Sequence, residues 1–182
     1  LRTAFDGMYA MEQQMLELYD KMGDASPEEL DKMMNTVGEI QSELEHSGFY
    51  SLDSKIEEFA NGLGLGSIGL DKDVSELSGG QRSKVLLTKL LLQNSQILLL
   101  DEPTNYLDVE HIEWLTKFLQ NYEHAFILIS HDIPFLNKVV NVIYHLENCE
   151  LTRYSGDYDK FQEMYAIYQS QKAAAYERQQ QE

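Results

Sequence analysis

The sequence predicts an α/β fold in which a helical layer precedes a parallel sheet, and two apolar runs indicate it. Residues 97–100 are four consecutive aliphatic residues, bounded by polar residues before them and by Asp101 and Glu102 after them. The run is too short for a helix of usual length and is typical of a parallel strand buried on both faces. Residues 125–129 form a second apolar run, and the segment between the two has helical spacing, as in a parallel strand–helix–strand unit.

Composition limits the classes of function that fit. The 182-residue chain carries 14 basic and 31 acidic residues, a net charge of −17, which argues against a broad surface that binds a phosphate backbone. One cysteine, Cys149, is too few for a disulfide framework or a thiolate metal site, and this fits a reducing compartment. The sequence shows no signal peptide and no apolar run that could span a membrane. Because it begins with Leu1 rather than Met, we expect a fragment.

Residues 1–95 are expected to form an acidic layer of helices. Helical spacing of apolar residues runs over 2–22 and again, in a shorter helix, over about 51–62. Between them Ser26 and Glu29 have the spacing of a capping box, with a proline at the first helical position. The apolar face of the helix that they begin is expected to pack in a core; it consists of Leu30, Met33, Met34, Val37, Ile40 and Leu44.

Glycines at 64, 66 and 69 match the spacing of a dinucleotide-binding fingerprint. That fingerprint requires a strand before it and a helix after it, whereas here a helix comes first. We therefore expect these glycines to end the third helix and form a loop.

A second glycine-containing motif, residues 77–81, has a different context. Ser78 and Gln81 have capping-box spacing, while Gly79 and Gly80 let a ligand approach the backbone, where free N–H groups attract anions. An ordinary capped helix with a glycine-rich entry is the alternative. The helix that follows is expected to be largely buried through Val85, Leu86, Leu87, Leu90, Leu91 and Leu92.

Polar groups capable of chemistry follow both predicted strands. Asp101 and Glu102 alternate in direction, so one suits a hydrated Mg²⁺ and the other suits polarising a water. His131 follows the second strand and is expected beside the same crevice as Glu102, because ligands bind at the carboxyl ends of parallel strands. For Asp101 and Glu102 the alternative is a strand that happens to end in a polar turn. For His131 the alternative is a structural histidine.

Further elements follow along the chain. Asp108 is expected to cap a helix, and Pro134 lies near the start of another. Residues 142–146 and 149–154 are expected to form a hairpin that turns at Glu147 and Asn148, with His145 in packing or on the surface. From Asp157 onward a last helix is expected to run to residue 182, with aromatic residues near one face that would pack against a partner helix.

The motifs at 77–81, 101–102, 107–108 and 130–132 together resemble ATP-binding-cassette ATPases. The resemblance implies that Ser78, Gly79, Gly80 and Gln81 form the signature motif, which contacts the γ-phosphate of ATP held by an opposing cassette. It implies that Asp101 serves Mg²⁺ and that Glu102 positions the attacking water. It also places His131 near the γ-phosphate and Asp108 at the cassette interface.

Within this superfamily the sequence is similar to the ABC-F group, soluble twin-cassette proteins that act on ribosomes in translation. Asn105 matches the asparagine that the group has at this position, whereas Tyr106 departs from the histidine most common there. Residues 154–158 are similar to the turn that opens the group's inter-cassette linker. The resemblance implies ATP and Mg²⁺ as cofactors, a second cassette and the ribosome or its rRNA as partners, no membrane, and a cytoplasmic location. The alternatives are an ATPase subunit of a membrane transporter and a non-enzymatic module that keeps the fold.

The sequence contains no Gly-x-x-x-x-Gly-Lys-Ser/Thr phosphate loop. We therefore expect a partial cassette: a helical subdomain over 1–95, the later part of a RecA-like parallel core over 96–156, and the start of a linker helix over 157–182. Without the phosphate loop, the chain by itself is expected to be inactive. Its incomplete sheet is expected to leave apolar surface that favours self-association.

Overall fold

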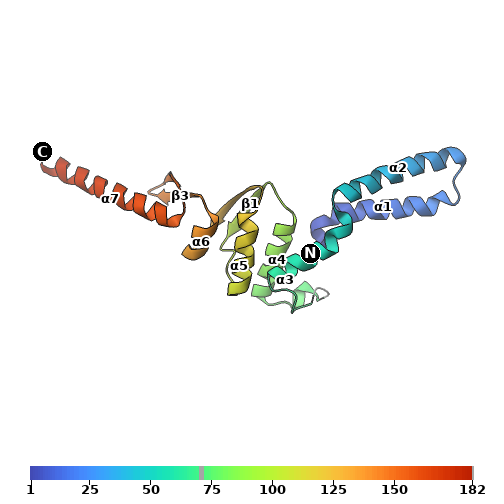
Figure 1. Cartoon of the computed structure of the whole chain (residues 1–182), viewed down its shortest axis with the longest axis horizontal. Helices are drawn as coiled ribbons and strands as arrows, with labels where there is room; N and C mark the ends of the chain where they lie inside the picture. Colours follow the sequence, from blue (N-terminus) through green and yellow to red (C-terminus); the bar gives the residue numbers. More distant parts are fainter. Residues whose placement is uncertain (70–71, 182) are drawn as a thin grey trace. The chain divides into compact units, whose positions relative to one another are not determined.

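The computed structural model describes residues 1–69 and 72–181, with the side chains of the last helix described up to residue 175. The chain divides into two compact units, Leu1–Ser95 and Gln96–Glu182, each of which is described by itself (Figure 1). Predictions for Glu182 lie outside the described residues. Within the described part of the chain, no helix has both the length and the apolar character needed to cross a bilayer.

The described residues of the first unit form helices joined by turns and loops, with no strand. Its elements are η1 (Arg2–Phe5), α1 (Asp6–Met22), α2 (Pro27–His46), η2 (Phe49–Ser51), α3 (Leu52–Gly62), η3 (Val74–Glu76) and α4 (Gly79–Leu92). The helices α1 and α2 lie side by side as an antiparallel pair (Figure 1). The capping box at the start of α2 is confirmed, since the Ser26 amide donates to Glu29 Oε2 at 3.0 Å.

The glycine that follows α3 ends that helix, as predicted. Gly64 has φ +77°, and the amide of Leu65 donates to the Ala60 carbonyl at 2.7 Å while that of Gly64 donates to Asn61 at 3.0 Å. This pair of hydrogen bonds is the Schellman arrangement, which requires a left-handed residue and therefore favours glycine.

Two predictions about burial in the first unit are wrong. Met34 and Leu86 are exposed, although the helix faces to which they were assigned are otherwise at least partly buried. In α4 only Thr88, Leu91 and Leu92 are fully buried. Successive helical residues differ by about 100° in direction, so the consecutive residues 85–87 cannot all face one layer.

The second unit contains a parallel strand pair and a separate antiparallel hairpin. Its elements are β1 (Ile97–Asp101), α5 (Val109–Gln120), β2 (Ala125–Ile129), α6 (Ile133–Val139), β3 (Val142–Glu147), β4 (Glu150–Ser155) and α7 (Tyr158–Gln181). The strands β1 and β2 pair in parallel with Ile97 opposite Ala125 and Asp101 opposite Ile129. Both strands therefore end at the same edge of the sheet. This arrangement of helices and small sheets is a partial cassette fold of the α/β class.

The prediction that β1 is buried on both faces is wrong for the described chain. Leu98 and Leu100 are 0% and 4% exposed, whereas Ile97 and Leu99 are 62% and 68% exposed. Ile127 and Ile129 of β2 are exposed as well. Because side chains alternate along a strand, one face of the sheet is covered and the other presents a row of aliphatic groups.

The hairpin turns one residue later than predicted. Glu147 pairs with Glu150, so the two turn residues are Asn148 and Cys149, with φ +50° and +66°. Two positive φ values are the requirement of the tight turns that fit the twist of a hairpin. The sequence indicated this turn only weakly, because of its two residues only Asn148 readily adopts a positive φ.

The first turns of α7 pack on the hairpin and also contact the helix α6, where Oδ1 of Asn137 accepts from the Asp159 amide at 3.1 Å. Asp157 caps the helix, as predicted, by accepting from the Lys160 amide at 3.0 Å. The Phe161 ring is 5.0 Å from that of Tyr154 and 5.3 Å from that of His145, which confirms a packing role for the histidine. The Tyr165 hydroxyl donates to Glu147 Oε1 at 3.0 Å. Beyond these contacts the helix continues away from the hairpin (Figure 1).

Candidate functional site

The register of the parallel pair brings together the two segments that carry the predicted site residues. Asp101 and Ile129 are the last residues of their strands and lie opposite each other. The Glu102 amide donates to the Ile129 carbonyl at 2.8 Å, which continues the ladder by one hydrogen bond. The residues that follow each strand therefore lie at one edge, where α/β proteins bind ligands.

Glu102 and His131 are in direct contact at this edge. Nδ1 of His131 lies 2.8 Å from Oε2 of Glu102, and the His131 amide is 3.4 Å from the same oxygen. The glutamate side chain is 27% exposed and the histidine side chain 78% exposed. A carboxylate held in this way still has acceptor capacity, and both side chains can be reached from solvent.

The contact shifts the titration of both groups in opposite directions. The hydrogen bond from the His131 side chain lowers the pKa of Glu102, while partial burial acts in the opposite direction. The same hydrogen bond, followed by the charge of the carboxylate, raises the pKa of His131. Glu102 is therefore ionised at neutral pH, as a group that orients a water molecule must be.

The backbone on either side of His131 is fixed by short-range hydrogen bonds. Ser130 Oγ accepts from the Asp132 amide at 3.1 Å, and Asp132 Oδ1 accepts from the Phe135 amide at 3.1 Å. The second of these bonds caps α6. His131 therefore lies in a short turn between β2 and α6 that these hydrogen bonds hold in place.

Asp108 is the N-cap residue of α5, as predicted, and it caps the helix through its backbone carbonyl rather than its side chain. Its carbonyl accepts from the amides of His111 and Ile112 at 2.9 Å, while its carboxylate makes no capping hydrogen bond. The side chain is exposed, and Oδ2 lies 4.0 Å from Nε2 of His111. The carboxylate is therefore available to a contact outside the described chain.

The motif at 78–81 lies in the first unit and begins α4. Oγ of Ser78 accepts from the Gln81 amide at 3.3 Å, and Oε1 of Gln81 accepts from the Ser78 amide at 2.9 Å, which is a complete capping box. A Cβ at Gly79 would meet no atom within 4 Å, so packing in the chain itself does not require this glycine. Open space beside the first amides of a helix suits an anion.

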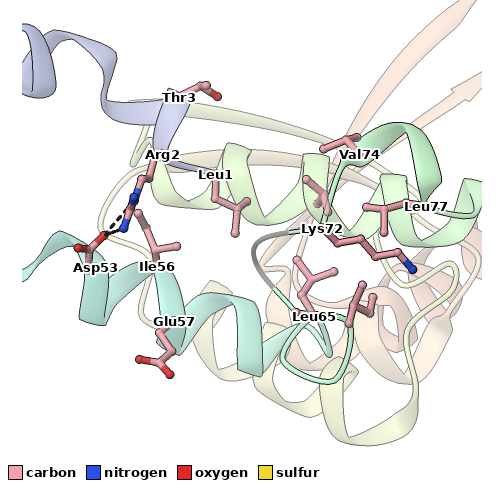
Figure 2. A pocket seen from close by; sticks show the side chains of 13 residues that line it. Leu1, Arg2, Thr3, Asp53, Ile56, Glu57, Leu65, Lys72, Val74 and Leu77 are labelled. Atoms are coloured by element: carbon pink, nitrogen blue, oxygen red, sulfur yellow. Dashed lines mark hydrogen bonds and ion pairs between the residues drawn. The ribbon is translucent and has the colours of Figure 1, made fainter.

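The first unit also contains a pocket of about 580 Å³ that none of the predicted site residues lines. Its apolar wall includes Ile56, Leu65 and Leu77, and Arg2 forms an ion pair with Asp53 at its rim, with 3.0 Å between Nη2 and Oδ1 (Figure 2). Leu77 precedes the Ser78 motif directly, so the pocket and the motif share one segment of chain.

One carboxylate at the edge of the sheet could contribute to holding a metal ion. Among the residues that the structure describes, no three histidine, cysteine, aspartate or glutamate side chains are grouped to hold a metal ion. Asp101 presents one exposed carboxylate at the end of β1. This fits Mg²⁺, which proteins commonly hold through one or two carboxylates together with phosphate oxygens of a substrate.

Sequence reasoning placed Glu102 and His131 near one crevice but missed two features of the turn after β1. Glu102 and Tyr106 have φ +47° and +66°, in the left-handed region. Glycine or asparagine would have been the sequence signal for such a conformation, and neither stands at these positions.

Comparison with known proteins identifies several relatives. Residues 6–105 match the family described as ABC transporter. The chain is 62% identical over 182 residues to the uncharacterized ABC transporter ATP-binding protein YfmM of Bacillus subtilis, covering 100% of this chain and 35% of that protein. It is 38% identical over 133 residues to the energy-dependent translational throttle protein EttA of Mycobacterium tuberculosis, covering 73% of this chain and 24% of that protein. The chain therefore spans about a third or less of the length of these relatives.

Solved structures with a similar fold include one with a ribosomal name. It is the complex of the archaeal ribosomal stalk protein aP1 with the archaeal ribosome recycling factor aABCE1. The TM-score is 0.51 at 26% sequence identity, over 69% of this chain and 26% of that chain.

Proposed function

The chain belongs to the ABC transporter family of ATP-binding domains, and from this membership we propose that it is part of an ABC-F type ATPase. In this proposal the complete protein binds and hydrolyses ATP between two cassettes in order to act on the ribosome in translation. The observation that carries the proposal is the contact of Glu102 with His131 at the carboxyl edge of a parallel strand pair.

We propose three parts with different tasks. Residues 1–95 form the helical subdomain with the signature motif, residues 96–156 form part of the nucleotide-binding core, and residues 157–182 begin the linker to the second cassette. The packing of α7 on the hairpin supports the last assignment, because it fixes the direction in which the linker leaves the core.

The core supplies the groups that act on the terminal phosphate. Glu102, kept ionised by its hydrogen bond from His131, accepts a proton from the attacking water and orients it. His131 holds the carboxylate, and its ring is exposed. In this proposal the ring would face the bound nucleotide. Asp101 would hold Mg²⁺, which when bound neutralises charge on the phosphate oxygens.

The signature motif and Asp108 serve the contact between cassettes. Ser78, Gly79, Gly80 and Gln81 begin α4, and the amides of its first turn would receive the γ-phosphate of ATP held by the other cassette. The exposed carboxylate of Asp108 would lie at the interface between the two cassettes.

The isolated chain should differ from the complete protein. Its sequence contains no phosphate loop, so we expect no ATP hydrolysis and at most very weak binding of Mg-ATP. Calorimetry on the isolated chain tests this, and micromolar affinity would contradict it.

Two lines of support favour the ribosome over a membrane transporter. EttA is named as a translational throttle protein and aABCE1 as a ribosome recycling factor. In addition, the glycine turn at Gly156 leads directly into the long helix α7, which suits an arm that joins two cassettes. A transporter ATPase would instead meet its membrane partner through the helical layer.

Co-sedimentation tests the ribosomal role. The complete protein with Glu102→Gln, which retains ATP, should pellet with ribosomes when ATP is present and stay soluble without it. Ser78→Arg in the same background is the matched control, because it blocks closure of the cassettes and should prevent pelleting. If the ATP-bound Glu102→Gln protein ignores ribosomes and pellets with membranes instead, the transporter alternative is correct.

A further inference from the structure

The short helix α6 connects the turn that carries His131 to the start of α7. It begins directly after Asp132, whose Oδ1 accepts from the Phe135 amide at 3.1 Å, and it has only seven residues. At 1.5 Å per residue such a helix is about 10 Å long. In sequence, by contrast, the whole hairpin of β3 and β4 lies between α6 and α7.

The end of α6 holds the first turn of α7. Oδ1 of Asn137 accepts from the Asp159 amide at 3.1 Å, and the carbonyl of Asn141, just beyond α6, accepts from the Gly156 amide at 2.9 Å. The first amides of a helix have no partner within the helix, so an acceptor on another element fixes the helix at that point. Two hydrogen bonds from this end of α6 therefore position the start of α7.

The turn that leads into α7 is itself held in one conformation. Gly156 has φ +123°, which other residues rarely adopt, and a Cβ at this position would lie 2.6 Å from Cδ of Lys160. Asp157 caps α7 directly after this glycine. Because hydrogen bonds hold the backbone on both sides of the turn, we expect a displacement of α6 to reach α7 rather than to be absorbed.

Packing lets α6 move as one piece. Phe135 and Leu136 on its first turns are buried, and Nε2 of Gln120 on α5 donates to the Lys138 carbonyl at 3.0 Å. Packed side chains and hydrogen bonds of this kind can carry energetic coupling between two sites.

We propose that Asn137 is a positioning residue that couples His131 to the linker helix. A nucleotide that contacts His131 shifts α6, and the hydrogen bond between Asn137 and the Asp159 amide makes α7 change direction with it. This inference rests on the proposed function, since it explains how the nucleotide site would act on the proposed linker. The alternative is a purely structural role, in which Asn137 stabilises α7 but α7 does not respond to nucleotide.

The test measures the distance between two spin labels in the complete protein, with and without a nonhydrolysable ATP analogue. The labels are attached at Lys117→Cys on α5 and Ser170→Cys on α7, which are exposed positions. The exposed Cys149 is replaced by asparagine, which tolerates its φ of +66°. The analogue should shift this distance in the otherwise unchanged protein.

Substitutions at Asn137 should separate coupling from stability. Asn137→Ala removes the acceptor for the Asp159 amide, so the shift should be lost while ATP turnover stays near that of the wild type. Asn137→Asp keeps an acceptor oxygen and should retain the shift. Gln120→Ala is the matched control, because it removes a hydrogen bond to the same end of α6 without touching α7, and it should also retain the shift.

A full shift in Asn137→Ala would overturn the proposal. Equal loss of the shift in Gln120→Ala would do so too, because it would show that any loosening of α6 has the same effect. A wild-type protein that binds no ATP would overturn the proposed function and this inference with it. A wild-type protein that hydrolyses ATP, beside an Asn137→Ala variant with the full shift, would overturn this inference alone.

Discussion

Replacing Phe161 with alanine should detach α7 from the hairpin of the second unit. The Phe161 side chain is 6% exposed, and its ring lies 5.0 to 5.6 Å from the rings of Tyr154, His145, Tyr158 and Tyr165. Truncating a buried phenylalanine costs about 3–5 kcal/mol. We expect about 3 kcal/mol here, because a helix packed on a two-stranded hairpin can shift to fill part of the space.

Urea unfolding of the chain, followed by circular dichroism, measures this loss, and hydrogen exchange of the α7 amides locates it. Ile167→Ala is the matched control on the same helix, since Ile167 is exposed and its truncation should change stability by about 0.5 kcal/mol or less. A loss below about 1 kcal/mol for Phe161→Ala, or unchanged exchange in α7, would refute the anchoring role of the ring.

Three other perturbations follow from the structure. In an NMR titration the imidazole of His131 should titrate above its ordinary pKa, and Glu102→Gln should remove this shift. The ion pair is complete at pH values between the pKa of Glu102 and the pKa of His131. It is lost as the pH rises through the pKa of His131 or falls through the pKa of Glu102. Leu99→Ser and Ile127→Ser remove exposed aliphatic groups and should reduce self-association of the chain in sedimentation, whereas unchanged association would exclude this face. If ATP closes the two proposed cassettes, small-angle scattering should show the complete protein becoming more compact with ATP, and Ser78→Arg should abolish this change. Wild-type compaction in Ser78→Arg would contradict the role of the motif.

The sequence predicted best those features that depend on a few neighbouring residues. The capping boxes at Ser26 and Ser78 and the helix end at Gly64 each rest on local hydrogen bonds, and the structure contains all three. The parallel strands were also predictable, because few other folds accommodate two short apolar runs separated by a helical pattern.

Features that depend on distant partners were harder to predict. Burial of Leu99 depends on what covers the second face of the sheet, which the strand pattern alone does not specify. The contact of Glu102 with His131 depends on the register of two strands. The left-handed backbone of Tyr106 could not be predicted, because the turn around it imposes this conformation against the preference of tyrosine.

Single-turnover hydrolysis of ATP by the complete protein tests the central claim most directly. If Glu102 orients the attacking water, Glu102→Gln should bind ATP as tightly as the wild type while the chemical step slows by a factor on the order of a hundred or more. The amide keeps the size of the side chain but cannot accept the proton of the water. Hydrolysis at a near-normal rate in this variant would contradict the assignment of Glu102 and, with it, the proposed hydrolytic site at the edge of the sheet.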